Sequence, residues 1–264
     1  MAVYNCERLL PEALESIANQ TYTNWELVAC DDASTDGTLA LLNDFAEAHP
    51  GKVIVLRNDV NSKLAFSLNR CLAAANGELI ARMDGDDKCL PERFEKQVAF
   101  LAEHPDLAVV GTAMRRFDDA GEHDVQTFEP RPTAEDQRYR VPFAHATIMM
   151  RKHAYDALGG YEVSARTVRG QDRDLWFRFS QKGLAGGNLS EPLYLVREDI
   201  AAIKRRTVEV RWNNMRTEII GYRRLGFPAR WYAGPIVQFA KVLIPAKAML
   251  LYRKWQSRRV SAVD

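Results

Sequence analysis

Carboxylates stand at two points of the sequence, each after an apolar segment typical of a strand. They are Asp31, Asp32, Asp84, Asp86 and Asp87. Ligands of open α/β sheets bind outside the carboxyl ends of the strands, so these side chains should converge on one crevice. Packed carboxylates repel one another unless their charge is compensated. A divalent cation shared with ligand phosphates would compensate it, and Asp84-Gly85-Asp86 has the D-x-D form that suits such a hard ion.

The D-x-D segment could instead be an ordinary turn without a ligand, because acidic turns with glycine are common. Asp36-Gly37, further upstream, indicates such a turn and a helix cap. The two groups of carboxylates, at the ends of successive predicted strands, together favour a ligand site.

The spacing of apolar residues predicts alternating strands and helices that would position these groups. Strands are expected over 23–30, 52–56, 77–87, 106–117, 146–150 and 192–196. Helices are expected over 10–17, 39–45, 64–75, 90–105 and 171–183, with a short one ending at Gly159-Gly160. Residues 118–140 are polar and irregular. The alternation predicts an α/β fold with a mixed, mostly parallel sheet flanked by helices.

The alternation begins with a helix, although a strand should precede it. Only Met1-Ala2-Val3 are left for that strand, whereas a strand usually has about five residues. We therefore expect the first strand to be largely missing and the native chain to extend upstream of Met1.

Several segments resemble family 2 glycosyltransferases, which have the GT-A fold. The opening AVYNCERLLPEALESIANQTYTNWELVACDDASTDGT resembles the start of that family, and ELIARMDGDDKCLPERFEKQV resembles its D-x-D segment and following helix. HATIMMRKHAYDALGGY and GQDRDLWFRF resemble its acceptor-side segment and the helix after it. The resemblance covers residues 1 to about 196, with the motifs in the correct order. It implies a Rossmann-like nucleotide-binding domain, expected here at 1–200.

On the donor side, the resemblance implies that Tyr4 and Asn5 line the pocket of the nucleotide base. Asp32 matches an aspartate that accepts a hydrogen bond from a uracil-like ring, and Asp31 would orient the loop or the ribose. Tyr4 could instead be a core aromatic residue. The implied donor is a nucleotide-diphosphate sugar, with UDP favoured.

The resemblance also implies a cofactor and a catalytic base. Asp86 would coordinate Mn²⁺ or Mg²⁺, and Asp84 would contact the ribose or the metal and its water. Asp172 matches the base that deprotonates the acceptor hydroxyl, and His145 matches a histidine near the diphosphate or acceptor. Gln171 stands where the family more often has Glu, on the acceptor side of the site.

Some of these roles have competitors in the sequence. Asp174 could be the base in place of Asp172, and either carboxylate could simply favour the helix dipole. His145 could be a buried histidine bonded to backbone. Lys63 stands where the family often has glycine, and it could reach a phosphate or be solvated.

The implied reaction is an inverting, metal-dependent transfer of a sugar to a hydroxyl acceptor, a saccharide or lipid-linked molecule, in cell-surface polysaccharide or lipopolysaccharide synthesis. Gln171 and the short first strand motivate an alternative, an inactive member that binds sugar nucleotide or a partner enzyme. A nucleotidyltransferase would need a glycine-rich phosphate loop near the N-terminus, and a dehydrogenase would need G-x-G-x-x-G; neither is present. A nucleic-acid partner lacks a recognisable motif.

The composition is that of a globular protein. The chain has 264 residues, of which 47% are hydrophobic and 27% charged, which argues against a disordered, collagenous or disulfide-scaffold protein. Its four cysteines have no CxxC spacing, so we expect reduced thiols in a cytoplasmic protein. No stretch free of Asp, Glu, Lys and Arg exceeds ten residues, so no conventional transmembrane helix is expected, and the first residues do not resemble a signal peptide.

Charge is distributed unevenly along the chain. Residues 201–264 hold 14 Lys+Arg and 3 Asp+Glu, whereas residues 1–200 hold 22 and 32. Aromatic and basic residues are interleaved over 226–264, which favours an amphipathic helical region that binds an anionic membrane surface. That surface would be the inner face of the cytoplasmic membrane. The alternative is a helical subdomain packed on the catalytic domain or on a partner.

Overall fold

The computed structural model describes residues 1–198 and 207–240. Its first sheet contains β1 (Ala2–Val3), β2 (Leu27–Asp31) and β3 (Val53–Arg57). Its second sheet contains β4 (Leu79–Ala81), β5 (Lys88–Cys89), β6 (Val109–Asp118), β7 (Gly121–Gln126), β8 (Met149–Arg151) and β9 (Gly186–Arg197). The α-helices are α1 (Leu10–Ala18), α2 (Thr38–Ala48), α3 (Leu64–Ala74), α4 (Arg93–Glu103), α5 (Lys152–Leu158), α6 (Gln171–Gln181), α8 (Val208–Arg224) and α9 (Ala233–Ala240). Short 3-10 helices lie at Glu135–Arg138, His145–Thr147, Ala165–Thr167 and Ala229–Tyr232.

The first sheet is parallel throughout, in the order β1-β2-β3. Every residue of β2 is buried, as expected for a central parallel strand covered on both faces. One buried face of α1, formed by Leu10, Ala13, Leu14 and Ile17, packs in the same core cluster as residues of β2. β1 has only two residues, and the Met1 ammonium donates a hydrogen bond of 2.8 Å to the Val28 carbonyl oxygen.

The second sheet has the order β4-β8-β6-β9-β5, with β7 paired to β6. β6 and β9 are parallel, and its other pairs are antiparallel. The sheet is mixed, as expected, and the other parallel pairs, β1–β2 and β2–β3, lie in the first sheet. β6 and β7 are antiparallel because a tight turn joins them, and parallel neighbours need a long crossover.

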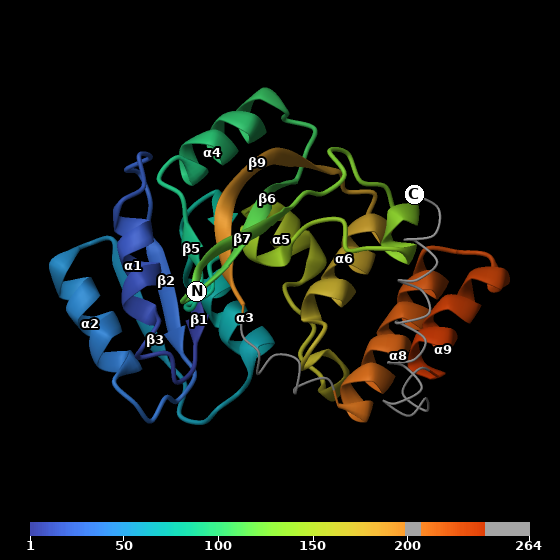
Figure 1. Cartoon of the computed structure of the whole chain (residues 1–264), viewed down its shortest axis with the longest axis horizontal. Coiled ribbons are helices and arrows are strands. Elements are labelled where there is room, and N and C mark those ends of the chain that lie inside the picture. Colours follow the sequence, from blue (N-terminus) through green and yellow to red (C-terminus); the bar gives the residue numbers. More distant parts are fainter. Residues whose placement is uncertain (199–206, 241–264) are drawn as a thin grey trace.

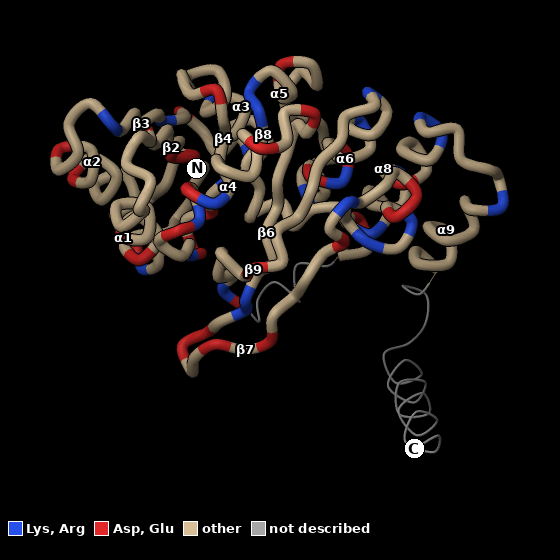
Figure 2. Tube along the Cα trace, turned by 90° about the horizontal axis from the view of Figure 1, so that it is seen from above, with Lys and Arg blue, Asp and Glu red and all other residues tan. Residues whose placement is uncertain are grey.

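β7 lies within 118–140, for which no regular structure was expected, and that expectation was wrong. Its residues are almost all exposed, so the segment carries no apolar alternation that would signal a strand. The β6–β7 hairpin projects from the body of the molecule and carries acidic residues (Figure 2).

The last described helices lie at the opposite end of the molecule from α1 and α2 (Figures 1 and 2). α8 packs closely on α6 because residue 221 is glycine: a Cβ atom there would lie 2.2 Å from the Phe177 ring. The neighbouring Tyr222 meets Phe177 edge to face, with ring centroids 5.9 Å apart. The expected domain boundary at residue 200 and the last part of the basic segment, 241–264, lie outside the described residues, so the division into 1–200 and 201–264 stays a prediction. Within the described ranges, we find no helix long and apolar enough to cross a membrane.

Candidate active site

Three segments that are distant in sequence meet beside the D-x-D turn. The Cys6 backbone N–H donates to the Thr38 hydroxyl at 2.8 Å, and the Cys6 thiol donates to the Gly85 carbonyl oxygen at 3.2 Å. The Asn5 N–H donates to the Ser34 hydroxyl at 2.9 Å. The first turn therefore contacts both segments that carry the predicted carboxylates.

Only glycine fits at position 85 without displacing its neighbours. A Cβ atom on this residue would lie 2.5 Å from the Val3 side chain and 3.3 Å from the Cys6 sulfur. The glycine of the D-x-D segment thus allows the close approach of the first strand and its turn, a need that the sequence pattern did not reveal.

Asp84 is held by a buried arginine. The Arg82 side chain is 5% exposed, and its Nη2 lies 2.5 Å from Asp84 Oδ1. The Asp84 backbone N–H donates to the Tyr194 hydroxyl at 3.1 Å. Because Arg82 already compensates the charge of Asp84, this carboxylate is fixed in position before any ligand binds.

Asp86 and Asp87 add negative charge to the same turn. Asp87 is buried and accepts a hydrogen bond of 2.8 Å from the Arg197 backbone N–H. Burial raises its pKa well above the usual value, and the charges of Asp84 and Asp86 raise it further. Burial also raises the pKa of the Cys6 thiol to about 12, assisted chiefly by the charge of Asp86.

This turn has the chemistry of a site for a hard divalent cation. Its negative charge disfavours further ionisation of Asp87 and Cys6, so a cation here would relieve repulsion. No group of three or more His, Cys, Asp and Glu side chains in the described parts of the chain could hold a metal ion by itself. One or two carboxylates suffice for Mg²⁺ when substrate phosphates complete the coordination. The residues present therefore fit an ion shared with a nucleotide diphosphate.

Asp32 is already engaged by the loop between β3 and α3. Its Oδ1 accepts from the Asn58 side chain at 2.6 Å and from the Ser62 N–H at 2.8 Å, and its Oδ2 accepts from the Lys63 N–H at 2.9 Å. Lys63 has φ of +73°, which explains why glycine suits this position and shows that the loop is strained around Asp32. Since a carboxylate offers about four acceptor positions, Asp32 keeps capacity for one more donor.

Asp31 is fully buried, and its two oxygens differ. Oδ2 accepts from the Ser34 N–H at 3.2 Å and lies 3.8 Å from Arg57 Nε, whereas Oδ1 has no hydrogen-bond partner. The contact with Ser34 agrees with the expected role of Asp31 in orienting the loop.

Tyr4 and Asn5 lie on the turn that follows β1. Tyr4 is 50% exposed, so it is not the core aromatic residue of the alternative interpretation. Asn5 has φ of +48°, and its side-chain oxygen accepts from the Thr35 N–H at 2.9 Å. The turn thus holds the segment that follows Asp32 and leaves Tyr4 exposed to solvent.

His145 begins the short 3-10 helix His145–Thr147. Its Nε2 is 2.9 Å from the Tyr161 hydroxyl, while its buried Nδ1 has no partner. Burial lowers the pKa of His145 well below its usual value, and the charge of Arg82 acts in the same direction. His145 is therefore a neutral imidazole held by a side chain, not the backbone-bonded histidine of the alternative interpretation.

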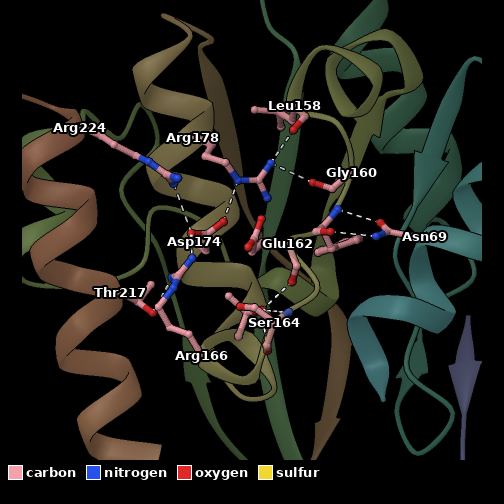
Figure 3. A network of polar contacts seen from close by, with 12 residues as sticks. Asn69, Leu158, Gly160, Glu162, Ser164, Arg166, Asp174, Arg178, Thr217 and Arg224 are labelled. Atoms are coloured by element: carbon pink, nitrogen blue, oxygen red, sulfur yellow. Dashed lines mark hydrogen bonds and ion pairs between the residues drawn. The ribbon is translucent and has the colours of Figure 1, made fainter. Parts of the chain in front are cut away.

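Asp174, the competitor for the catalytic base, is the centre of a structural network (Figure 3). It is 1% exposed, and its oxygens lie 2.9 Å from Arg166, 2.7 Å from Arg178 and 3.3 Å from Arg224. Burial opposes ionisation, but the hydrogen bonds from Arg178 and Arg166 outweigh it and lower the pKa of Asp174. Asp174 is thus a charged anchor that ties α6 to α8 and to the segment before α6, and it has no access to a substrate.

Asp172 occupies a different position in the first turn of α6. It is partly exposed and lines a cavity of about 650 Å³ formed with α8, α9 and the segment around residue 138. Gln171, next to it, accepts a hydrogen bond of 3.1 Å from the Gly170 N–H through its side-chain oxygen. These two residues are not in contact with the D-x-D turn through any hydrogen bond or ion pair described for residues 1–198 and 207–240.

Sequence reasoning missed the arginines that bind Asp84 and Asp174. Arg178 follows Asp174 by four residues on one helix, so that pair could have been foreseen. Arg166 and Arg224 reach Asp174 from other segments, and Arg82 is buried beside Asp84; no local pattern signals these contacts.

Comparison with known proteins agrees with this arrangement. EpsE of Bacillus subtilis (strain 168) is 44% identical over 254 residues, which are 96% of this chain and 91% of EpsE. The amylovoran biosynthesis glycosyltransferase AmsE of Erwinia amylovora is 30% identical over 231 residues, or 84% of this chain and 83% of AmsE.

Solved structures show the same fold at lower identity. The structure of S. aureus TarS 1-349 in complex with UDP-GlcNAc superimposes with a TM-score of 0.69 at 20% identity, covering 92% of this chain and 70% of that one. The chain spans 38% of the longer TarS chain.

Residues 1–159 match the family described as Glycosyl transferase family 2. The match includes the first turn, both groups of carboxylates and His145. With these motifs, this fold and these relatives, the chain is a glycosyltransferase that belongs to family 2 and has the GT-A fold.

Proposed function

We propose that this enzyme is metal-dependent and inverting, and that it transfers a sugar from a nucleotide-diphosphate donor, UDP in the first instance, to a hydroxyl acceptor in cell-surface polysaccharide or lipopolysaccharide synthesis. The observation that carries the proposal is that the first turn contacts both carboxylate segments: Asn5 bonds Ser34 and Thr35 in the segment after Asp32, and Cys6 bonds Thr38 and Gly85. Two similar proteins support the chemistry, since AmsE is named for amylovoran biosynthesis and TarS was solved with UDP-GlcNAc.

The proposed donor site uses residues whose positions are already fixed. Tyr4 and Asn5 would contact the base, and Asp32 would use its remaining acceptor position for a ring N–H. Asp84, held by Arg82, would contact the ribose or the metal ion. Asp86 would hold Mn²⁺ or Mg²⁺, which when bound would stabilise the charge of the leaving diphosphate as a Lewis acid.

The proposed base is Asp172. The acceptor hydroxyl would attack the anomeric carbon as Asp172 takes its proton, and the bond from that carbon to the diphosphate oxygen would break, releasing the nucleoside diphosphate. A single displacement inverts the anomeric configuration. Gln171 would orient the acceptor or the base, and neutral His145 would lie near the diphosphate or acceptor without adding charge.

Thermal melting of the purified protein tests the donor proposal. We expect UDP with Mn²⁺ or Mg²⁺ to raise the melting temperature, whereas dTDP and GDP should raise it less and EDTA should cancel the effect. A ligand at 100 times its dissociation constant stabilises by about 2.7 kcal/mol, which is a readable shift. Absence of a shift with every nucleotide would contradict the proposal. A metal-dependent shift without any sugar transfer would support an inactive, nucleotide-binding member of the family.

We also propose that the enzyme works at the inner face of the cytoplasmic membrane, through an anionic lipid surface contacted by 226–264. Within the described part of that region, Ile236 and Val237 of α9 are exposed. Trp212 of the preceding helix α8 is also exposed, and its ring lies beside that of Phe239. Vesicles containing phosphatidylglycerol should carry the protein upward in flotation, and Ile236→Ser with Val237→Ser should reduce that fraction several-fold. Equal flotation with neutral vesicles, or none with anionic vesicles, would remove the membrane proposal.

A further inference from the structure

The cavity beside Asp172 is strongly basic. Four arginines line it, Arg138, Arg169, Arg173 and Arg211, together with two acidic residues, Asp172 and Glu218. The D-x-D turn has the opposite character, with three carboxylates in four residues. The two regions therefore suit different partners: the turn suits a cation, and the cavity suits an anion.

Two of the four arginines are half-buried and held by neighbouring side chains. Arg173 forms an ion pair with Glu218. The Arg138 guanidinium lies over the Trp231 ring, 3.5 Å from its centroid, which fixes its position and leaves its charge uncompensated. Glu218 compensates the charge of Arg173. The other three arginines and Asp172 therefore leave the cavity with a net charge of +2.

The other two arginines face the cavity from different segments. Arg169 precedes α6, and Arg211 lies in the first turn of α8; both side chains are exposed. Neither guanidinium group makes a hydrogen bond or ion pair with another residue in the described ranges. An exposed arginine alone is ordinary, but two such groups from separate elements, on one concave surface that also holds Asp172, form a site for a bidentate anion. The guanidinium fork matches phosphate oxygens in pairs.

The cavity also has an apolar side. Met215 of α8 and Pro235 and Phe239 of α9 line it. A ligand that fills the cavity would therefore combine an anionic group with an apolar or saccharide portion, as in a phosphate ester.

We propose that the acceptor is a phosphate ester whose phosphate or diphosphate binds Arg169 and Arg211, so that its saccharide hydroxyl faces Asp172. The proposal deepens the function above and rests on it, because it takes Asp172 as the base. The phosphate could belong to a soluble sugar phosphate or to a lipid-linked saccharide, and both present the same group to the arginines.

Calorimetric titrations in EDTA test this site, because EDTA removes metal-dependent binding at the D-x-D turn. The probes are inorganic pyrophosphate, glucose 1-phosphate and geranyl diphosphate. We expect Arg169→Gln with Arg211→Gln to weaken binding of the phosphate probes by about 10-fold or more, since charge-assisted hydrogen bonds are lost. The matched control is Arg216→Gln with Arg223→Gln, which removes two exposed arginines of α8 that do not line the cavity. This control should bind as the unchanged protein does.

The probes distinguish the two sources of phosphate. Tighter binding of geranyl diphosphate than of pyrophosphate would support a lipid-linked acceptor that uses the apolar side. Tighter binding of glucose 1-phosphate than of either would support a soluble sugar phosphate. Failure of all three probes to bind, or equal binding by the double variant and its control, would overturn the proposal. If the double variant melts below the control, the single variants Arg169→Gln and Arg211→Gln repeat the comparison.

Melting with UDP and Mn²⁺ on the same samples separates this proposal from the proposed function. A UDP response without phosphate-probe binding overturns the acceptor site alone. Phosphate-probe binding that depends on Arg169 and Arg211, without any nucleotide response, supports the anion site and contradicts the proposed function.

Discussion

Replacing Asp172 by asparagine should lower turnover by about 10²-fold or more and leave donor binding unchanged. Asparagine keeps the size and polarity of the side chain but cannot take a proton from the acceptor hydroxyl. Asp172 makes no hydrogen bond or ion pair that holds the described part of the structure together, so the fold should be unaffected. Steady-state release of nucleoside diphosphate in the presence of acceptor measures turnover, and nucleotide-dependent melting measures donor binding.

Asp174→Asn is the informative comparison for this variant. It removes a carboxylate that three arginines bind, and breaking such a buried group costs about 3–5 kcal/mol of unfolding free energy. We therefore expect Asp174→Asn to lower the melting temperature strongly and Asp172→Asn to lower it little. If Asp172→Asn kept full turnover, the base would have to be sought elsewhere in the chain.

Replacing Asp86 by alanine should abolish metal-dependent donor binding, the second large effect that we expect. Asp84 is bound to Arg82 and Asp87 is buried, so the loss of Asp86 would remove the exposed carboxylate of the turn. One or two carboxylates typically anchor Mg²⁺ before substrate phosphates complete its coordination. Calorimetry with UDP in Mn²⁺ and in EDTA should show a difference for the unchanged protein and none for Asp86→Ala.

The control for this prediction removes an aspartate far from the turn. Asp44 is exposed on α2, and Asp44→Ala should keep the full response to Mn²⁺. Burial is the main cause of the raised pKa of Cys6 and of Asp87, and Asp86→Ala removes one of the charges that add to it, so both pKa values should fall toward their usual range. If donor binding by Asp86→Ala still depended on Mn²⁺, the metal site would have to be assigned to other residues.

The sequence by itself determined most of the secondary-structure elements, and through the family motifs it predicted which residues form the donor side of the site. The core helices and the strands β2, β3, β6 and β9 follow apolar periods that are local, so a short window contains the whole signal. The sequence predicted that the two groups of carboxylates follow strands, and they do follow β2 and β4. These strands belong to different sheets, and the turn after β1 links the two segments through Asn5 and Cys6.

Other features were decided only by the tertiary structure. The strand β7 forms by pairing with β6, and Arg82 is buried beside Asp84 by the packing around it. The strand order of the second sheet and the contacts of Asp174 with Arg166 and Arg224 join segments that are distant in sequence. Asp172 and Asp174 are two residues apart and alike in sequence, yet one faces a cavity and the other meets three arginines. The basic cavity likewise gathers Arg138, Arg169 and Arg211 from three segments. Such groupings leave no periodic pattern along the chain, because their spacing is set by how helices pack and not by the repeat of any one element.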